Sequence, residues 1–246
     1  MRNIAVRLEP GWRRAADPAW LEGWVERDFE LPGGVTRVVA MGEGPPLLLV
    51  PPLPGFKEAY AACAFRLARR FRVVTWDLRT AFDGRPPWDA LVDDARRIAD
   101  AFAPGLAVIA GHSLGGAVAQ RFALAHPSRV ASLVLSSAFA RVVTPRSQWA
   151  ARYLDQPYVL AGLRFLPEPR AMAFARDLAA RGRWVFEPRC DDHVLGLVIH
   201  GARHVSIGMA LGRVRLAFGH DTRADLPRIA SRAPGMRRVS SSAASR

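Results

Sequence analysis

Residues 111–116 read GHSLGG, and this stretch decides the fold that the sequence predicts. The apolar run 106–110 precedes it, which is the pattern of a strand buried on both faces. Residues 114 to about 125 follow with helical character and are stopped by a proline. A G-x-S-x-G pattern between a strand and a helix is typical of a sharp turn that exposes a serine nucleophile, with glycines where side chains would collide. We therefore expect Ser113 to stand clear at a strand-to-helix turn.

The sequence on both sides of this turn alternates between strand-type and helix-type segments. Residues 24–40 predict a β-hairpin broken at Pro32-Gly33-Gly34. Buried strands are expected at 47–50, 71–76, 106–110 and 130–136, and helices at 57–70, 88–102 and 114–125. This order predicts an α/β fold, a mostly parallel sheet with helices on both faces.

The chain of 246 residues is long enough for one large domain or for a core with an inserted lid. Half of the residues are hydrophobic and 23% are charged, which excludes wholesale disorder and collagen-like or low-complexity architecture. Beyond residue 139 the alternation stops and helical stretches such as 170–180 follow. We expect a core over 1–140, a helical lid over 141–220 and a C-terminal segment over 221–246 that is disordered from about 231.

The formal charge of +13 raises the question of nucleic-acid binding. The basic side chains are almost all arginines scattered through amphipathic segments, and no zinc-finger, RNP or basic-zipper pattern is present. We therefore expect a small molecule, and not nucleic acid, as the ligand.

Cysteine usage and the length of the apolar runs indicate the compartment. Only Cys63 and Cys190 are present, too few for a disulfide framework or a thiolate metal site. The N-terminus lacks the apolar region of a signal peptide, and no apolar run approaches the roughly 18–20 residues that cross a bilayer. These features predict a cytoplasmic protein without a membrane span.

The strand, the GHSLGG turn and the helix together resemble the α/β-hydrolase family, over about residues 26–140. The helical region that follows is similar to the lid that these proteins insert after the sixth strand. The resemblance implies a serine nucleophile at Ser113, oriented by an acid and a histidine that come later in the chain. It implies no metal and no organic cofactor.

The resemblance also implies two backbone N–H groups that stabilise an oxyanion. One is the N–H of Leu114, directly after Ser113. The other comes from the loop after the third strand, which usually begins His-Gly in this family but reads PPLPG at residues 51–55 here. By position the donor is Leu53, which keeps its N–H although its neighbours are prolines. The Pro-Pro pair is similar to that of maspardin, a hydrolase-fold protein regarded more as a binding partner than as an enzyme.

The acid and the histidine of the family are not identifiable in this sequence. Residues 221–229 resemble the segment that leads from the lid into the seventh strand, but an arginine-containing stretch and serines follow in place of a Val/Leu/Ile run. We therefore expect the C-terminal strands of the fold to be missing, through truncation or a change of reading frame, together with the usual acid and base.

An alternative interpretation supplies both groups from within the chain. Residues 194–199 would form a late strand, with Asp192 as the acid and His204 as the base. The gap between them is short for the helix that a parallel crossover requires. The histidines in this region are otherwise explained as ordinary polar residues of a lid. His112 points away from Ser113 in a turn of this kind.

Two functions follow from these expectations. The first is a serine hydrolase that acts on an ester-like or other small acyl substrate, with Ser113 as nucleophile and the N–H groups of Leu53 and Leu114 as oxyanion donors. The alternative is a catalytically incomplete hydrolase-like protein that binds a small molecule or a partner, or a remnant of an enzyme. The fold alone does not name the substrate.

Overall fold

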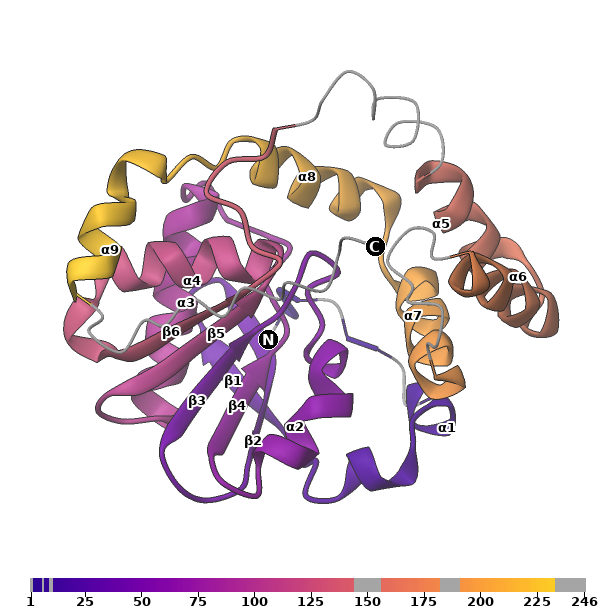
Figure 1. The fold of residues 1–246 in the computed structure, drawn as a ribbon, viewed down its shortest axis with the longest axis horizontal. Coiled ribbons are helices and arrows are strands. Elements are labelled where there is room, and N and C mark those ends of the chain that lie inside the picture. Colours follow the sequence, from indigo (N-terminus) through magenta and orange to yellow (C-terminus); the bar gives the residue numbers. More distant parts are fainter. Residues whose placement is uncertain (1, 6, 9–10, 144–155, 182–190, 233–246) are drawn as a thin grey trace, which may run out of the picture.

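The computed structural model describes residues 2–5, 7–8, 11–143, 156–181 and 191–232. Its centre is a six-stranded sheet in the order β1-β2-β4-β3-β5-β6 (Figure 1). The β3–β4, β3–β5 and β5–β6 pairs are parallel, whereas β1–β2 and β2–β4 are antiparallel. The strands are β1 (Glu26–Leu31), β2 (Gly34–Met41), β3 (Pro46–Val50), β4 (Arg72–Trp76), β5 (Ala107–His112) and β6 (Val130–Ser136).

Helices cover both faces of the sheet, which confirms the predicted α/β class. On the chain before and between the strands lie α1 (Trp12–Ala15), η1 (Pro18–Leu21), η2 (Lys57–Tyr60), α2 (Ala61–Leu67), α3 (Pro87–Phe102), α4 (Leu114–Ala125) and η3 (Pro127–Arg129). After β6 come α5 (Gln156–Phe165), α6 (Glu168–Ala180), α7 (Asp192–His204), α8 (Ile207–Phe218), η6 (Arg223–Asp225) and α9 (Leu226–Arg232).

The strand β3 shows why the central strands are apolar throughout. Leu48 and Val50 point to one face and pack with residues of α3 and α4, such as Ile98 and Phe122. Leu47 and Leu49 point to the other face and pack with Trp12, Phe56 and Ala64. Side chains alternate along a strand, so a strand with helices on both faces must be apolar at every position.

The helices after β6 form a separate apolar cluster beside the sheet. Val159 and Leu163 of α5, Ala175 of α6 and Leu195 and Ile199 of α7 are buried against one another. Helix α7 also contacts α1 and η2, so this cluster rests on the N-terminal part of the chain. Helix α8 then leads back across the top of the sheet in Figure 1 to α9, which packs against α4.

One expectation for the C-terminal half needs correction. Residues 194–199, the late strand of the alternative interpretation, lie inside the helix α7. Residues 221–229 contain η6 and the first part of α9. Within the described residues β6 is the last strand and lies at the edge of the sheet. Most of the segment expected to be disordered, residues 233–246, lies outside the described residues.

The described helices include no single one that is long and apolar enough to cross a membrane. Asp192–His204 and Gly208–Phe218 reach that length and composition only as a pair, and they are bent by 102° where they meet.

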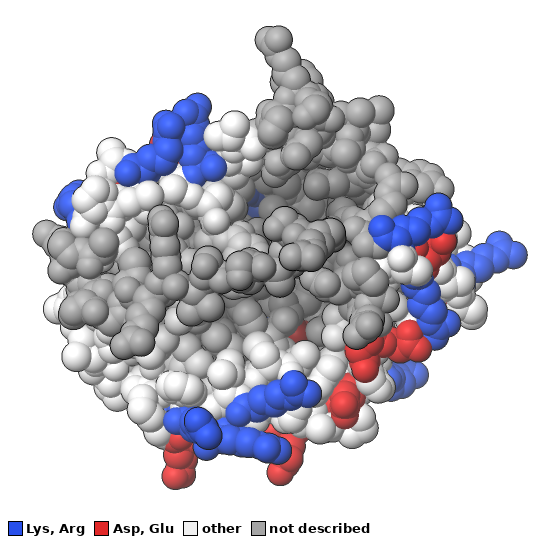
Figure 2. All heavy atoms as spheres, in the orientation of Figure 1, with Lys and Arg blue, Asp and Glu red and all other residues white. Residues whose placement is uncertain are grey.

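Charged side chains are distributed in separate groups. On the face drawn in Figure 2, basic groups lie apart from one another and several have acidic side chains beside them. The ion pairs of Arg96 with Asp93 and Asp100, along α3, are of this kind.

Candidate active site

Ser113 lies between β5 and α4, in the turn where the sequence places it. Its backbone has φ +53° and ψ −119°, a left-handed conformation that a residue with a side chain rarely adopts. The Ser113 N–H donates to the Ser136 carbonyl at 3.1 Å, and the Ser113 carbonyl accepts from Gly116 N–H at 3.0 Å. The turn is therefore fastened to β6 on one side and to the first turn of α4 on the other. The side chain is partly exposed.

The glycines around Ser113 are required by close contacts of the backbone. A Cβ at Gly111 would lie 2.3 Å from the Gly115 carbonyl oxygen, and one at Gly115 would lie 2.1 Å from the Val50 carbonyl oxygen. A Cβ at Gly116 would lie 2.4 Å from the Cβ of Ala138. Each of these separations is shorter than two heavy atoms tolerate, so the chain cannot make this turn with larger residues.

The loop at residues 51–55 leaves the sheet beside the Ser113 turn. Val50, the last residue of β3, is paired with Gly111 of β5, so both strands end at the same edge. Within the loop, Gly55 N–H donates to the Pro52 carbonyl at 2.8 Å. Among the described residues neither Leu53 N–H nor Leu114 N–H donates a hydrogen bond. Both predicted donors are thus unused at this edge.

Tyr60 connects the two strand ends, a role that the sequence did not reveal. Its hydroxyl donates to the Val50 carbonyl at 2.8 Å and accepts from His112 N–H at 3.0 Å. Burial raises the pKa of the Tyr60 hydroxyl, although its hydrogen bond with His112 acts in the opposite direction. The phenol therefore stays protonated and keeps both bonds at neutral pH. A tyrosine on the inner face of a predicted helix is normally packing, so no sequence signal marked this bond.

Lys57, the only lysine of the chain, holds a buried group of carboxylates behind the same loop. Its Nζ lies 2.7 Å from Glu58 Oε1, 3.1 Å from Asp77 Oδ2 and 3.5 Å from Glu26 Oε2. Burial lowers the pKa of Lys57, but the three carboxylates outweigh this effect and raise it. Burial raises the pKa of Glu58 to about 7 against the pull of Lys57. Asp77 also accepts the backbone N–H of Lys57 at 3.0 Å, so it fixes where the loop ends.

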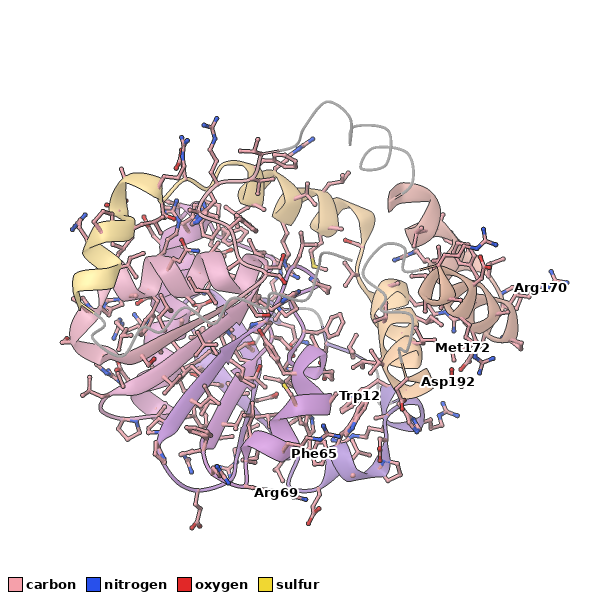
Figure 3. The ribbon with its side chains drawn as sticks, in the orientation of Figure 1. Trp12, Phe65, Arg69, Arg170, Met172 and Asp192 are labelled. Atoms are coloured by element: carbon pink, nitrogen blue, oxygen red, sulfur yellow. The ribbon has the colours of Figure 1, made fainter. Side chains whose placement is uncertain are left out.

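The structure does not bring Asp192 and His204 together. They are the first and last residues of α7, about 18 Å apart along the axis of a 13-residue helix. Asp192, labelled in Figure 3, pairs with Arg176 of α6 at 2.7 and 2.9 Å. The His204 ring bonds through Nδ1 to the His200 carbonyl of its own helix at 2.8 Å. The alternative acid and base therefore cannot act as a pair.

None of the six histidines is hydrogen-bonded to Ser113, and all six lie in the described part of the chain. His112 is the last residue of β5 and is exposed, and its Nδ1 lies 3.4 Å from Ser136 Oγ. The Ser113 hydroxyl has no hydrogen-bond partner among the described side chains.

His220 is the most buried histidine, and both of its ring nitrogens are occupied. Arg121 Nε can only donate, so Nδ1 of His220 accepts this bond at 3.2 Å and the ring proton is on Nε2. Nε2 then donates to Thr222 Oγ1 at 3.2 Å, and Thr222 donates to Gln120 Oε1 at 2.6 Å. The rings of Trp88 and Phe139 lie 5.1 and 5.6 Å from the imidazole. This arrangement requires a neutral His220 that ties α4 to the segment before α9.

We expect His220 to make the protein sensitive to acid. Burial, reinforced by the Arg121 charge, lowers the pKa of His220 from 6.5 to about 4. Between these values the unfolded chain binds a proton that the folded chain does not, so stability is full above pH 6.5 and falls as the pH drops toward 4. The shift corresponds to about 3 kcal/mol. Urea unfolding at pH 7 and pH 4 should show this loss in the wild type and a smaller one in His220→Gln. His204→Gln is the matched control, and an equal loss in His220→Gln would contradict the assignment.

The comparisons with known proteins agree with the fold. A family model described as the alpha/beta hydrolase fold matches residues 45–166, about half of the chain, from β3 into α5. This range contains both the loop at 51–55 and the Ser113 turn. The chain belongs to the α/β-hydrolase superfamily.

Individual relatives are distant. A Mycobacterium phage D29 protein named "Putative non-heme haloperoxidase" is 35% identical over 109 residues, which are 42% of this α/β-hydrolase and 39% of the phage protein. The match thus spans about two fifths of that relative. The structure of an N-formylmaleamic acid deformylase from Pseudomonas putida S16 has a TM-score of 0.60 at 18% identity, covering 85% of this chain and 89% of the other. A hydrolase from Pseudomonas aeruginosa PA01 has a TM-score of 0.58 at 24% identity, with coverages of 82% and 76%. These structures share the fold.

Two surface cavities of this α/β-hydrolase lie away from Ser113. One of about 510 Å³ is lined by Trp12, Trp24 and Glu26 beside the β1–β2 hairpin. The other, of about 490 Å³, lies between Trp88 of α3 and Arg121 of α4. In the first cavity Arg37 is paired with Glu26 at 2.9 Å, whereas in the second Arg121 bonds the ring of His220 and lies over the Trp88 ring.

Proposed function

We propose that this protein is a serine hydrolase that acts on an ester-like or other small acyl substrate. The observation that carries the proposal is Ser113 at φ +53° between β5 and α4, in a turn whose glycines leave no room for larger residues. A strained backbone that the surroundings hold in place is characteristic of functional sites. The strain here keeps one hydroxyl clear of the helix that follows.

The proposed chemistry is acyl transfer through Ser113. Its Oγ attacks the carbonyl carbon, and the negative charge that develops on the carbonyl oxygen is stabilised by the N–H groups of Leu53 and Leu114. The 12-residue helix α4 adds the positive end of its dipole at Leu114. Collapse of the intermediate breaks the bond to the leaving group, which takes up, by way of solvent water, the proton that Ser113 Oγ gave up. Water then adds to the acyl-enzyme, the acid is released, and a proton returns to Ser113 Oγ. Neither N–H donates a hydrogen bond within the described residues, which supports their assignment as oxyanion donors.

The second candidate is a hydrolase-fold protein that binds an acyl compound without turning it over. It is favoured by the absence of a hydrogen bond between Ser113 and any of the six histidines in the described structure. Without a general base a serine hydroxyl is a weak nucleophile, and only about 10³–10⁴-fold catalysis over water is left from binding and the oxyanion donors.

The experiment that separates the two candidates is labelling with a fluorophosphonate followed by peptide mapping. We expect the adduct on the peptide that contains Ser113 in the native protein and no adduct in a heat-unfolded sample, because the reaction needs an activated hydroxyl. A protein with the circular dichroism of a folded α/β chain that stays unlabelled would contradict the hydrolase proposal and favour the binding protein. An adduct on another serine would contradict the assignment of Ser113.

A further inference from the structure

Arg213 of α8 reaches from the helices after β6 into the centre of the molecule. Only 5% of its surface is exposed. Its Nη1 donates to the Leu53 carbonyl at 3.0 Å and to the Pro54 carbonyl. Its Nη2 donates to the Leu78 carbonyl at 2.8 Å and weakly to the Arg79 carbonyl at 3.4 Å. One guanidinium thus joins the loop at 51–55 to the chain that leaves β4.

The surroundings of Arg213 contain no carboxylate in contact with it among the described residues. Burial lowers the pKa of Arg213 to about 10, against the more distant charge of Asp77, so the guanidinium remains protonated at neutral pH. A buried cation is costly unless its hydrogen bonds are satisfied, and here backbone carbonyls satisfy them. The charge is therefore held next to Leu53 without being neutralised in direct contact.

The conformation of the loop at 51–55 leaves space for the Arg213 side chain. Gly55 has φ +75°, and a Cβ there would lie 1.9 Å from Nη1 of Arg213. Three of the five loop residues are prolines, which have no N–H to donate. Within the loop the one backbone bond is from Gly55 N–H to the Pro52 carbonyl, and the Gly55 carbonyl accepts from Leu78 N–H at 2.7 Å. The carbonyls of Leu53 and Pro54 are held by Arg213 alone among the described residues.

We propose that Arg213 is the positioning residue of the oxyanion site, because it fixes the conformation in which Leu53 presents its free N–H. The inference rests on the proposed function of Ser113. The guanidinium acts through the loop and not by touching the substrate. Its unneutralised charge also favours negative charge that develops beside Leu53, since a fixed cation in a dry site acts more strongly than one in water.

The test compares Arg213→Met and Arg213→Lys with the wild type and with Arg215→Met, which changes an exposed arginine of the same helix. Methionine keeps most of the packing but removes the charge and the donors, and lysine keeps the charge but loses the planar fork. Turnover of a p-nitrophenyl ester gives kcat and KM, and hydrogen exchange of the Gly55 and Leu78 amides, which donate to the Pro52 and Gly55 carbonyls, reports the order of the loop.

We expect Arg213→Met to lower kcat about 10²-fold or more with KM changed only a few-fold, and to speed exchange of the two amides. The kcat and the amide exchange rates of Arg213→Lys should lie between those of Arg213→Met and the wild type. Arg215→Met should have the kcat and the exchange rates of the wild type. If Arg213→Met does not fold, Arg213→Lys alone tests the inference, which then requires a lower kcat with KM changed only a few-fold. A folded variant with ordinary kcat, or one in which only KM rises, would overturn the inference.

The failure of the proposed function gives a different result. A wild type that neither turns over the ester nor reacts with a fluorophosphonate refutes the hydrolase proposal, and the catalytic part of the Arg213 inference with it. The amide exchange then still reports whether Arg213 orders the loop. An active wild type whose exchange and kcat are both insensitive to Arg213→Met refutes the inference alone.

Discussion

Ser113→Ala is expected to reduce turnover of a p-nitrophenyl ester by about 10³-fold or more, without a comparable change in stability. The hydroxyl is the attacking group in the proposed reaction, so its removal leaves only the oxyanion donors and substrate binding. Stability should change little because Ser113 Oγ has no hydrogen-bond partner among the described residues, and the turn is held by backbone bonds to Ser136 and Gly116. Alanine and serine both carry a Cβ, so the strain energy of the backbone at φ +53° is similar for the two residues.

The measurement is kcat/KM together with the urea midpoint for both proteins. Ser128→Ala is the matched control, since Ser128 is an exposed serine in η3 at the opposite end of α4. It should leave turnover and labelling unchanged. Turnover in Ser113→Ala that stays within tenfold of the wild type would show that another group performs the reaction. A large drop in the urea midpoint would show that the loss of activity reflects unfolding.

Most of the sheet could be predicted because its signals are local. Residues 114–125 and 130–136 were predicted with the boundaries that the structure has, since a glycine turn, a proline stop and an apolar run mark them. The strand β5 extends two residues beyond the predicted 106–110, because His112 still pairs with Ser136 of β6. Strand ends depend on the neighbouring strand, which a single segment cannot show.

The alternative strand at 194–199 failed for a physical reason. A short run of Val, Leu and Ile fits a buried strand and a buried helix equally well. The signal that decides is Asp191, whose carboxylate accepts from His193 N–H at 2.7 Å and caps a helix of 13 residues. Leu195 and Ile199 then lie one helical turn apart and face the same apolar cluster.

The contacts that complete the candidate site were hidden from the sequence because they are non-local. Arg213 is one of 34 arginines and bonds Leu53, 160 residues away. Tyr60 bonds His112 across 52 residues. No spacing in the sequence distinguishes these side chains from solvated arginines or packed aromatic rings. The Ser113 turn is visible because the residues that form it lie within six positions of the sequence, whereas the groups that contact it come from distant elements.

Gly115→Ala is expected to destabilise the fold by about 2 kcal/mol or more and to remove most of the activity. Its Cβ would lie 2.1 Å from the Val50 carbonyl oxygen and 2.7 Å from that of Pro51, and both atoms are backbone. The start of α4 must therefore move away from the end of β3. That movement separates Leu114 and Ser113 from the loop that carries Leu53, so the two proposed oxyanion donors move apart. A misplacement of about 1 Å is enough to cost about 10²-fold in rate.

Gly212→Ala separates this steric effect from the general consequence of replacing a helical glycine. Gly212 lies within α8, and a Cβ there meets nothing within 4 Å. Alanine is favoured over glycine in a helix by about 0.8–1 kcal/mol, so Gly212→Ala should raise the urea midpoint while Gly115→Ala lowers it. The same chemical change thus has opposite signs at two helical positions, and the sign depends on the closeness of the neighbouring backbone. Equal midpoint shifts in the two variants would mean that α4 and β3 are not in the tight contact on which the Ser113 turn depends.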